Sequence, residues 1–166
     1  MNSSILEDFE STTSKLITIL SSLDEEALNK VPFKNSWTAG QVGDHLYKSY
    51  NIIKVLNGNV EITERSPDKK LADIQKLFLD FTSKMEAPKE TIPTDEYIKK
   101  DPLINSLHKR IDQHLEVIRT KDLSKLCVDF GIPGYGLFTR LEWIGFNTVH
   151  TKRHIHQLNT IIDKMR

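Results

Sequence analysis

Apolar residues recur every three or four positions along most of the chain, which is the spacing of helices that bury one face. Regular alternation of β-branched and polar residues, the pattern of exposed strands, is not evident. The pattern therefore predicts an all-α protein, a four-helix bundle with one or two additional short helices, in a single domain over residues 1–166. The clearest apolar stripe contains Ile5, Phe9, Leu16, Ile19 and Leu20.

Polar residues at the ends of these stripes predict where the helices begin. Three pairs have the spacing of a capping box, in which the first side chain and the fourth bond each other's backbone N–H groups. Ser66-Pro67 predicts a further helix start, with the helix continuing to about Met85. Residues 57–66 and the glycine-rich stretch 130–138 are expected to be loops. The three pairs are Ser22 and Glu25, Thr38 and Gln41, and Thr139 and Glu142.

Composition removes several classes of protein. Lysine plus arginine equals aspartate plus glutamate at 23 each among 166 residues, so a concentrated nucleic-acid surface is not expected. No run approaches the roughly 20 apolar residues of a membrane span, and the N-terminal residues lack the pattern of a signal peptide. The single cysteine, Cys127, cannot form an internal disulfide, and we expect it to be a buried apolar residue. A cytoplasmic protein with no membrane partner is the simplest expectation.

The stretch "HTKRHIHQL" contains three of the six histidines. On a helix, His150 and His154 share one face because they are four residues apart, whereas His156 points elsewhere. Buried imidazoles need polar partners. We therefore expect His156 at the surface or in an interface, and a third partner for the other two from another helix.

His45 is the candidate third partner, in the helix that Thr38 caps. It lies seven residues after that cap, about 10 Å along the helix. His150 lies 11 residues after Thr139, about 16 Å along its own helix. With both caps at the same end, the histidines fall within about two turns of each other. Three converging imidazoles form a divalent-metal site with an open position, but from the residues alone two core or surface histidines fit equally well.

Other side chains receive structural roles. Neither paired Glu-x-x-His motifs nor a His-Glu-x-x-His motif occurs, and the glycines match no phosphate-binding loop. Trp37 is expected to pack as a hydrophobic staple and Trp143 in the core. His108 and His114 are expected at the surface or in helix packing. Three amides could orient imidazole nitrogens or line the site: Gln41, Asn147 and Gln157.

Three stretches carry a resemblance to a known family: "SWTAGQVGDHL", "GLFTRLEW" and "HTKRHIHQL". Together with the order of the helices, they resemble the DinB-like superfamily over essentially the whole chain. The resemblance implies that His45, His150 and His154 bind a divalent metal ion, zinc or nickel among others. His156 stands where members often have glycine, so no ligand role is implied for it.

The resemblance also implies a class of function. DinB-like proteins include transferases that use low-molecular-weight thiols, such as bacillithiol transferases and mycothiol-dependent maleylpyruvate isomerases, and proteins described as metal-dependent hydrolases. A small-molecule substrate, possibly such a thiol, and a homodimer are therefore expected, with metal-bound water or thiolate as the reactive group. Two alternatives stay open: a non-catalytic metal-binding or stress-response protein, and a helical interaction module without metal.

Overall fold

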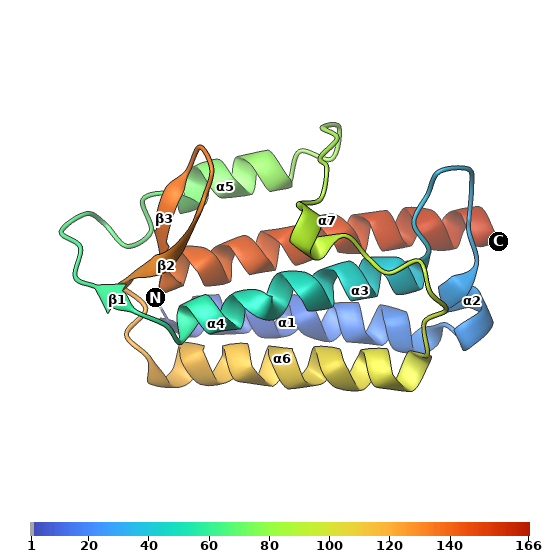
Figure 1. The fold of residues 1–166 in the computed structure, drawn as a ribbon, viewed down its shortest axis with the longest axis horizontal. Helices are drawn as coiled ribbons and strands as arrows, with labels where there is room; N and C mark the ends of the chain where they lie inside the picture. Colours follow the sequence, from blue (N-terminus) through green and yellow to red (C-terminus); the bar gives the residue numbers. More distant parts are fainter. Residues whose placement is uncertain (1) are drawn as a thin grey trace.

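The computed structural model describes residues 2–166 and is mainly helical, with one small sheet (Figure 1). A mainly helical protein is what the sequence predicts. The helical elements are α1 (Asn2–Ser22), α2 (Glu25–Asn29), α3 (Ala39–Ser49), the 3₁₀ turn η1 (Tyr50–Ile52), α4 (Ile53–Leu56), α5 (Leu71–Phe78), the 3₁₀ turn η2 (Lys89–Thr91), α6 (Lys100–Thr120) and α7 (Arg140–Met165). The strands are β1 (Val60–Glu61), β2 (Leu126–Ile132) and β3 (Gly136–Thr139).

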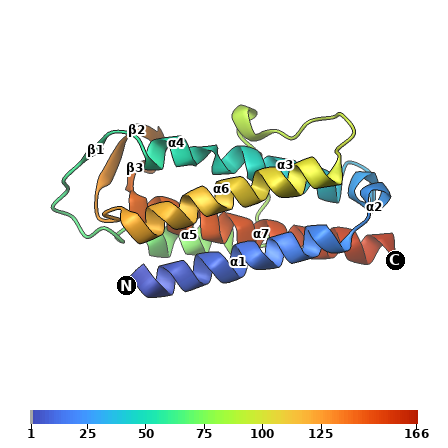
Figure 2. The same cartoon turned by 90° about the horizontal axis from the view of Figure 1, so that it is seen from below.

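Four helices, α1, α6, α3 and α7, lie side by side along the long axis (Figures 1 and 2). In that order each packs against the next, and α7 packs back against α1. α5 lies along the outer side of α7, and α3 and α7 run in opposite directions (Figure 1). The core between the helices is apolar, with fully buried side chains that include Phe9, Leu16, Leu46, Leu107 and Leu158.

Two of the three predicted capping boxes are confirmed. Thr38 and Gln41 exchange both bonds at the start of α3, and Thr139 and Glu142 do so at the start of α7. The third prediction is wrong, because Asp24 caps α2 by accepting the N–H of Ala27 at 2.8 Å. The negative charge of a carboxylate also stabilises the positive N-terminal end of a helix, which a neutral serine hydroxyl does not do.

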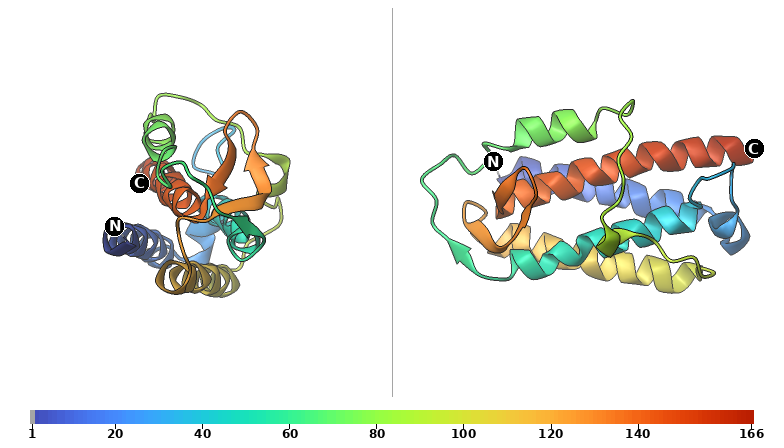
Figure 3. Two further views of the ribbon diagram at one scale, coloured as in Figure 1. Left: turned by 90° about the vertical axis from the view of Figure 1, so that its left-hand side faces the viewer. Right: turned by 45° about the horizontal axis from the view of Figure 1, so that its top comes forward.

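The structure adds to the predicted helices one small sheet that an all-α protein would lack. Strands β1, β2 and β3 form an antiparallel sheet in that order, across one end of the helices (Figure 3). The glycine-rich stretch, expected as a loop, forms the end of β2, the turn and β3. Gly134 and Gly136 have φ of 86° and 75°, which side chains other than glycine rarely adopt, so the chain can reverse there.

The segment after the sheet's first strand also differs from the prediction. α5 begins at Leu71 and ends at Phe78, whereas the sequence predicts a helix from Ser66-Pro67 to about Met85. At the start of α5, tertiary contacts hold the preceding chain out of the helix, since the Lys70 N–H donates to Glu142 Oε2 at 2.7 Å. The helix predicted from Thr38 to about Leu56 is interrupted by η1.

The structure also bears on two expectations from composition, the burial of Cys127 and the absence of a membrane span. Cys127 is fully buried, and burial raises the pKa of its thiol to about 11, so the thiol stays protonated as the sequence predicts for an apolar core residue. Within residues 2–166, no helix has the length and apolarity to cross a membrane.

Glu142 ties the start of α7 to the neighbouring loops. Its carboxylate is fully buried and accepts both terminal nitrogens of Arg65, at 2.6 and 3.0 Å. It also accepts the backbone N–H of Thr139 at 3.0 Å and that of Lys70. A buried charge is stable only when its oxygens are paired in this way. The beginning of α7, and therefore everything it carries, is fixed by this carboxylate.

Substitution Arg65→Ala is expected to lower the free energy of unfolding by about 3 kcal/mol, because it leaves the buried Glu142 charge without its counter-ion. Urea unfolding followed by circular dichroism measures the change. Arg119→Ala is the matched control, since the Arg119–Glu10 pair is exposed and its loss should cost less than about 1 kcal/mol. Equal losses in the two variants would show that Glu142 does not depend on Arg65.

Candidate metal centre

The three candidate ligands meet between α3 and α7. His45 comes from α3, and His150 and His154 come from successive turns of α7. The Nε2 atoms of His45 and His154 lie 3.2 and 3.1 Å from Nε2 of His150, and the ligand atoms of all three lie within 4.8 Å of one another. The structure therefore brings together the residues that the sequence predicts as a set.

The route by which they meet differs from the one expected. The sequence predicts that the histidines lie at similar depth if the caps of both helices are at the same end, whereas α3 and α7 are antiparallel and their caps lie at opposite ends (Figure 1). His45 still reaches the pair because α7 is 26 residues long, and the histidines of α7 lie well along it from its cap. The convergence is thus a property of where α3 crosses α7, and equal depth from the caps plays no part.

Two of the three rings are held by hydrogen bonds at their outer nitrogens. Nδ1–H of His45 donates to the backbone carbonyl of Thr91 at 2.7 Å. Nδ1–H of His154 donates to Oε1 of Gln157 at 2.7 Å. A ring that donates from Nδ1 has its lone pair on Nε2, so both rings present an acceptor to the centre of the cluster. Gln157 therefore orients an imidazole, one of the roles that the sequence leaves open.

The arrangement fits a divalent cation. His45 and His154 both turn a lone pair toward Nε2 of His150, where a proton could satisfy only one of them, whereas a cation at the centre could bind all three rings. The pKa of all three rings is lowered, chiefly by burial, and that of His154 falls to about 3. The imidazoles are therefore neutral near pH 7, which is the form that binds metal.

Aromatic rings surround the cluster. The Trp37 ring lies 5.1 Å from the His45 ring and is stacked on that of His154 at 6.3 Å. Phe78 and Phe146 pack against His150 on the other side. Trp37 thus borders the candidate centre, a role beyond the hydrophobic staple that the sequence predicts. Trp37 and His154 are both partly exposed, so their side of the cluster is the one nearest to solvent.

A connecting segment, residues 91–94, lies over α3 and is called the strap below. Besides the Thr91 carbonyl on His45, three side chains on the same face of α3 hold the strap. Gln41 is among them, so it holds the strap and caps α3 but orients no imidazole. The contacts are Gln41 Nε2 to the Thr94 carbonyl at 3.0 Å, the Thr94 N–H to Asp44 Oδ2 at 2.8 Å, and Lys48 Nζ to the Ile92 carbonyl at 2.8 Å.

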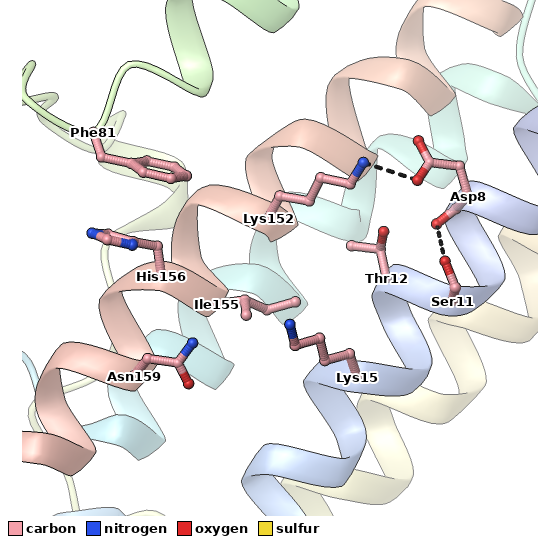
Figure 4. A pocket seen from close by; sticks show the side chains of 9 residues that line it. All are labelled: Asp8, Ser11, Thr12, Lys15, Phe81, Lys152, Ile155, His156 and Asn159. Carbon is pink, nitrogen blue, oxygen red and sulfur yellow. Dashed lines mark hydrogen bonds and ion pairs between the residues drawn. The ribbon is translucent and has the colours of Figure 1, made fainter.

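His156 lies outside the cluster, as the spacing predicts. It is exposed and stacks on Phe81, with ring centroids 4.1 Å apart (Figure 4). Both rings line a shallow groove of about 440 Å³ between α1 and α7, in which Lys152 pairs with Asp8 at 2.9 Å. None of the three candidate ligands lines this groove, so it is a separate surface of α7.

Another buried histidine, His114, lies outside the cluster. His114 of α6 is fully buried, donates from Nδ1 to the Arg110 carbonyl at 2.7 Å, and accepts from Nδ2 of Asn147 at 2.9 Å. Its packing role is confirmed, and His108 is exposed. In this structure the Asn147 amide nitrogen thus bonds His114, and no bond joins Asn147 to a candidate ligand.

Comparisons with known proteins agree with this geometry. The model of the DinB superfamily matches residues 8–158, which is most of the chain. The chain belongs to the DinB superfamily. It is also similar to the uncharacterized protein YuaE of Bacillus subtilis (strain 168), with 24% identity over 153 residues that cover 88% of this chain and 90% of the relative. No solved structure matches the chain significantly.

Membership of the DinB superfamily confirms the resemblance seen in the sequence. The sequence did not identify two groups at the site, because neither can be recognised from its residue type or spacing. The Thr91 carbonyl is one, because any residue offers a backbone carbonyl. Phe78 is another, since apolar spacing identifies a buried residue but not the ring it packs on. Trp37 stands directly before the Thr38 cap, inside the motif shared with the DinB superfamily, and that was the available signal.

Acid is expected to destabilise the metal-free protein in part through His114. Burial lowers the pKa of His114 to about 4, against about 6.5 in an unfolded chain. The unfolded chain therefore binds the proton first, so this stabilisation is complete above about pH 6.5 and is lost as the pH falls toward 4. Between pH 7.5 and 4.5, the loss attributable to His114 is about 2 to 3 kcal/mol.

The measurement is urea unfolding at the two pH values in the presence of a chelator, for the wild type and His114→Gln. Because the other buried histidines titrate in both proteins, the difference between the two proteins isolates His114. The variant should lose less stability on acidification than the wild type. An identical loss in both would contradict the role assigned to burial of His114.

Proposed function

We propose that this DinB protein is a metal-dependent enzyme of the low-molecular-weight-thiol S-transferase or hydrolase type, built on a four-helix bundle of α1, α3, α6 and α7. His45, His150 and His154 are the proposed ligands of one divalent ion, zinc or nickel. The observation that carries the proposal is the convergence of three buried Nε2 atoms, two of them held by bonds at the opposite ring nitrogen. Imidazole suits both metals.

The residues around the cluster support a reactive site. Within residues 2–166, no carboxylate or cysteine joins the three histidines, so three neutral ligands leave a position for water or substrate. A divalent ion in such a set lowers the pKa of a water or thiol that it binds. Trp37, Phe78 and Phe146 supply apolar walls that limit water near the cluster, which strengthens electrostatic interactions there.

One observation favours the alternative, a non-catalytic metal-binding protein. A general base of the protein's own must lie within hydrogen-bond reach of the proton it takes. Among the described residues, the acidic side chain next to His45, Asp44, instead accepts the Thr94 N–H and pairs with Lys48. The cluster therefore has the donors for a metal without an evident base beside it, and activity measurements must decide.

Replacement of any one proposed ligand by alanine is expected to abolish tight metal binding, because two imidazoles compete poorly with water for most divalent ions. The variants are His45→Ala, His150→Ala and His154→Ala. His156→Ala is the matched control, since it removes an imidazole from the same helix that faces the groove. Metal content after chelation and reconstitution compares the four side by side. Loss in the control together with retention in His150→Ala would refute the assignment.

Catalysis is tested with a thiol and an electrophile of simple chemistry. With 1-chloro-2,4-dinitrobenzene, the thiolate sulfur bonds the ring carbon, chloride leaves, and the thiol proton passes to solvent. We expect the reaction of bacillithiol or mycothiol with this electrophile to be faster in the presence of the metal-loaded wild type than in the presence of His154→Ala or of the wild type plus chelator. Hydrolysis of an aryl ester without thiol would indicate the hydrolase type. Bound metal without turnover in either assay would favour the non-catalytic alternative.

The homodimer stays a prediction. Sedimentation at micromolar concentration tests it independently of the metal, because none of the proposed ligands has to come from a second chain.

A further inference from the structure

Three buried polar atoms on one face of α7 have no hydrogen-bond partner within residues 2–166. They are Nε1 of Trp143, Oδ1 of Asn147 and Nδ1 of His150. The residues are four and three positions apart, so their side chains follow one another along the same face. Leaving a buried donor or acceptor unpaired costs about 1–3 kcal/mol, so three in one row call for partners.

Bonds from α6 fix which way the Asn147 amide faces. His114 donates from Nδ1 to the Arg110 carbonyl, so its Nε2 is an acceptor. The atom of Asn147 that lies 2.9 Å from this Nε2 must then be the amide nitrogen, which donates. Oδ1 is consequently directed away from His114 and is free to accept. The orientation thus follows from an anchored chain of donors and acceptors.

The unpaired atoms are complementary. A metal ligand that binds through Nε2 has its proton on Nδ1, and such ligands almost always donate that proton to an oxygen. His45 and His154 do so, to Thr91 and Gln157. His150 is the third member of the set, and the unpaired acceptor one turn before it on α7 is Oδ1 of Asn147.

We infer that Asn147 is the positioning residue of His150: its side-chain oxygen accepts the Nδ1–H of His150 through one bound water molecule. The inference rests on the proposed metal binding by His150. A carbonyl oxygen has two lone pairs, so the same atom can also accept the N–H of Trp143. Helix α6 supplies no ligand, but through its His114 and the Asn147 amide it sets the orientation of the His150 ring.

A purely structural role for the three polar residues leaves part of the row without a purpose. Apolar side chains would fill the same core without unpaired atoms, yet this row combines two donors with one acceptor that can serve both. The bond to His114 satisfies the nitrogen of Asn147 but not its Oδ1. If Asn147 positions His150, both ends of its amide have a role. His150 Nδ1, the one outer nitrogen of the cluster without an acceptor, then has one as well.

The test compares zinc affinity and the state of the His150 ring in four proteins: wild type, Asn147→Leu, Asn147→Asp and Thr148→Val. Leucine keeps the approximate shape of asparagine without an acceptor, and aspartate keeps an acceptor. Thr148→Val is the matched control, because Thr148 is a buried neighbour whose hydroxyl bonds the Ile144 carbonyl. Competition with a chromophoric chelator gives the affinity, and ¹H–¹⁵N correlation of the ring nitrogens gives the protonation and exchange of His150 Nδ1.

Asn147→Leu should bind zinc about 10- to 100-fold more weakly than the wild type, the loss typical when the outer partner of a histidine ligand is removed. Its His150 Nδ1–H should also exchange faster. Asn147→Asp should restore most of the affinity, even where urea unfolding shows lower stability because the bond to His114 is lost. Thr148→Val should lose stability without losing affinity.

Wild-type affinity and an unchanged Nδ1–H signal in Asn147→Leu would overturn the inference while leaving the proposed function intact. A wild type that binds no zinc would instead refute the proposed function. Should Asn147→Leu fail to fold, the zinc-loaded wild type decides. A His150 Nδ1–H that exchanges as fast as that of the exposed His156 would overturn the inference, and a protected one would support it.

Discussion

The close approach of three neutral imidazoles is the constraint on which the rest of the structure depends. The Nε2 atoms of His45 and His154 both carry a lone pair and lie about 3 Å from Nε2 of His150, an unfavourable arrangement in an apolar core unless a proton or a cation lies between them. It persists because surrounding groups hold two of the rings by the opposite nitrogen and burial keeps all three rings uncharged. A main-chain carbonyl and a glutamine do this for two rings, and the aromatic walls provide the burial. The cluster is therefore a product of its whole neighbourhood, since the Thr91 carbonyl, Trp37 and Phe78 come from outside α3 and α7.

Helix α7 links this neighbourhood to the rest of the fold. It packs against α1, α3 and α5, and its first turn is tied to the loop before α5 through Glu142. Further along, Arg153 donates to the carbonyls of Phe78, Asp80 and Ser83, which holds the chain after α5 against α7. Phe78 is thereby kept beside His150. One helix thus carries two of the candidate ligands together with the contacts that position their surroundings.

The sequence predicts the helical class, two of the three helix caps and the pairing of His150 with His154 because each depends on local spacing. His45 lies 105 residues from His150, so local spacing could not assign it, and the resemblance to the DinB-like superfamily did. The sheet was beyond that reach, since β1 has only two residues and β3 only four, too few for an alternating pattern. The antiparallel course of α3 and α7 depends on the long connection through α5, whose path no local pattern encodes. The strap was missed for a similar reason. Its grip on His45 is made by a backbone carbonyl, and its other contacts join residues about 50 positions apart.

The strap makes the candidate metal centre tolerant of side-chain substitution but sensitive to a break in the main chain. Because a backbone carbonyl holds His45, replacing the Thr91 side chain leaves that hydrogen bond in place, and point mutation is a poor way to remove it. The geometry depends instead on the continuity and length of the main chain between α5 and α6. Residues 84–90, which lead into the strap, are almost entirely exposed. A single proteolytic cut or a short insertion there can release the carbonyl while all three histidines remain in the chain, so the centre tolerates substitution at the strap better than it tolerates a break before it.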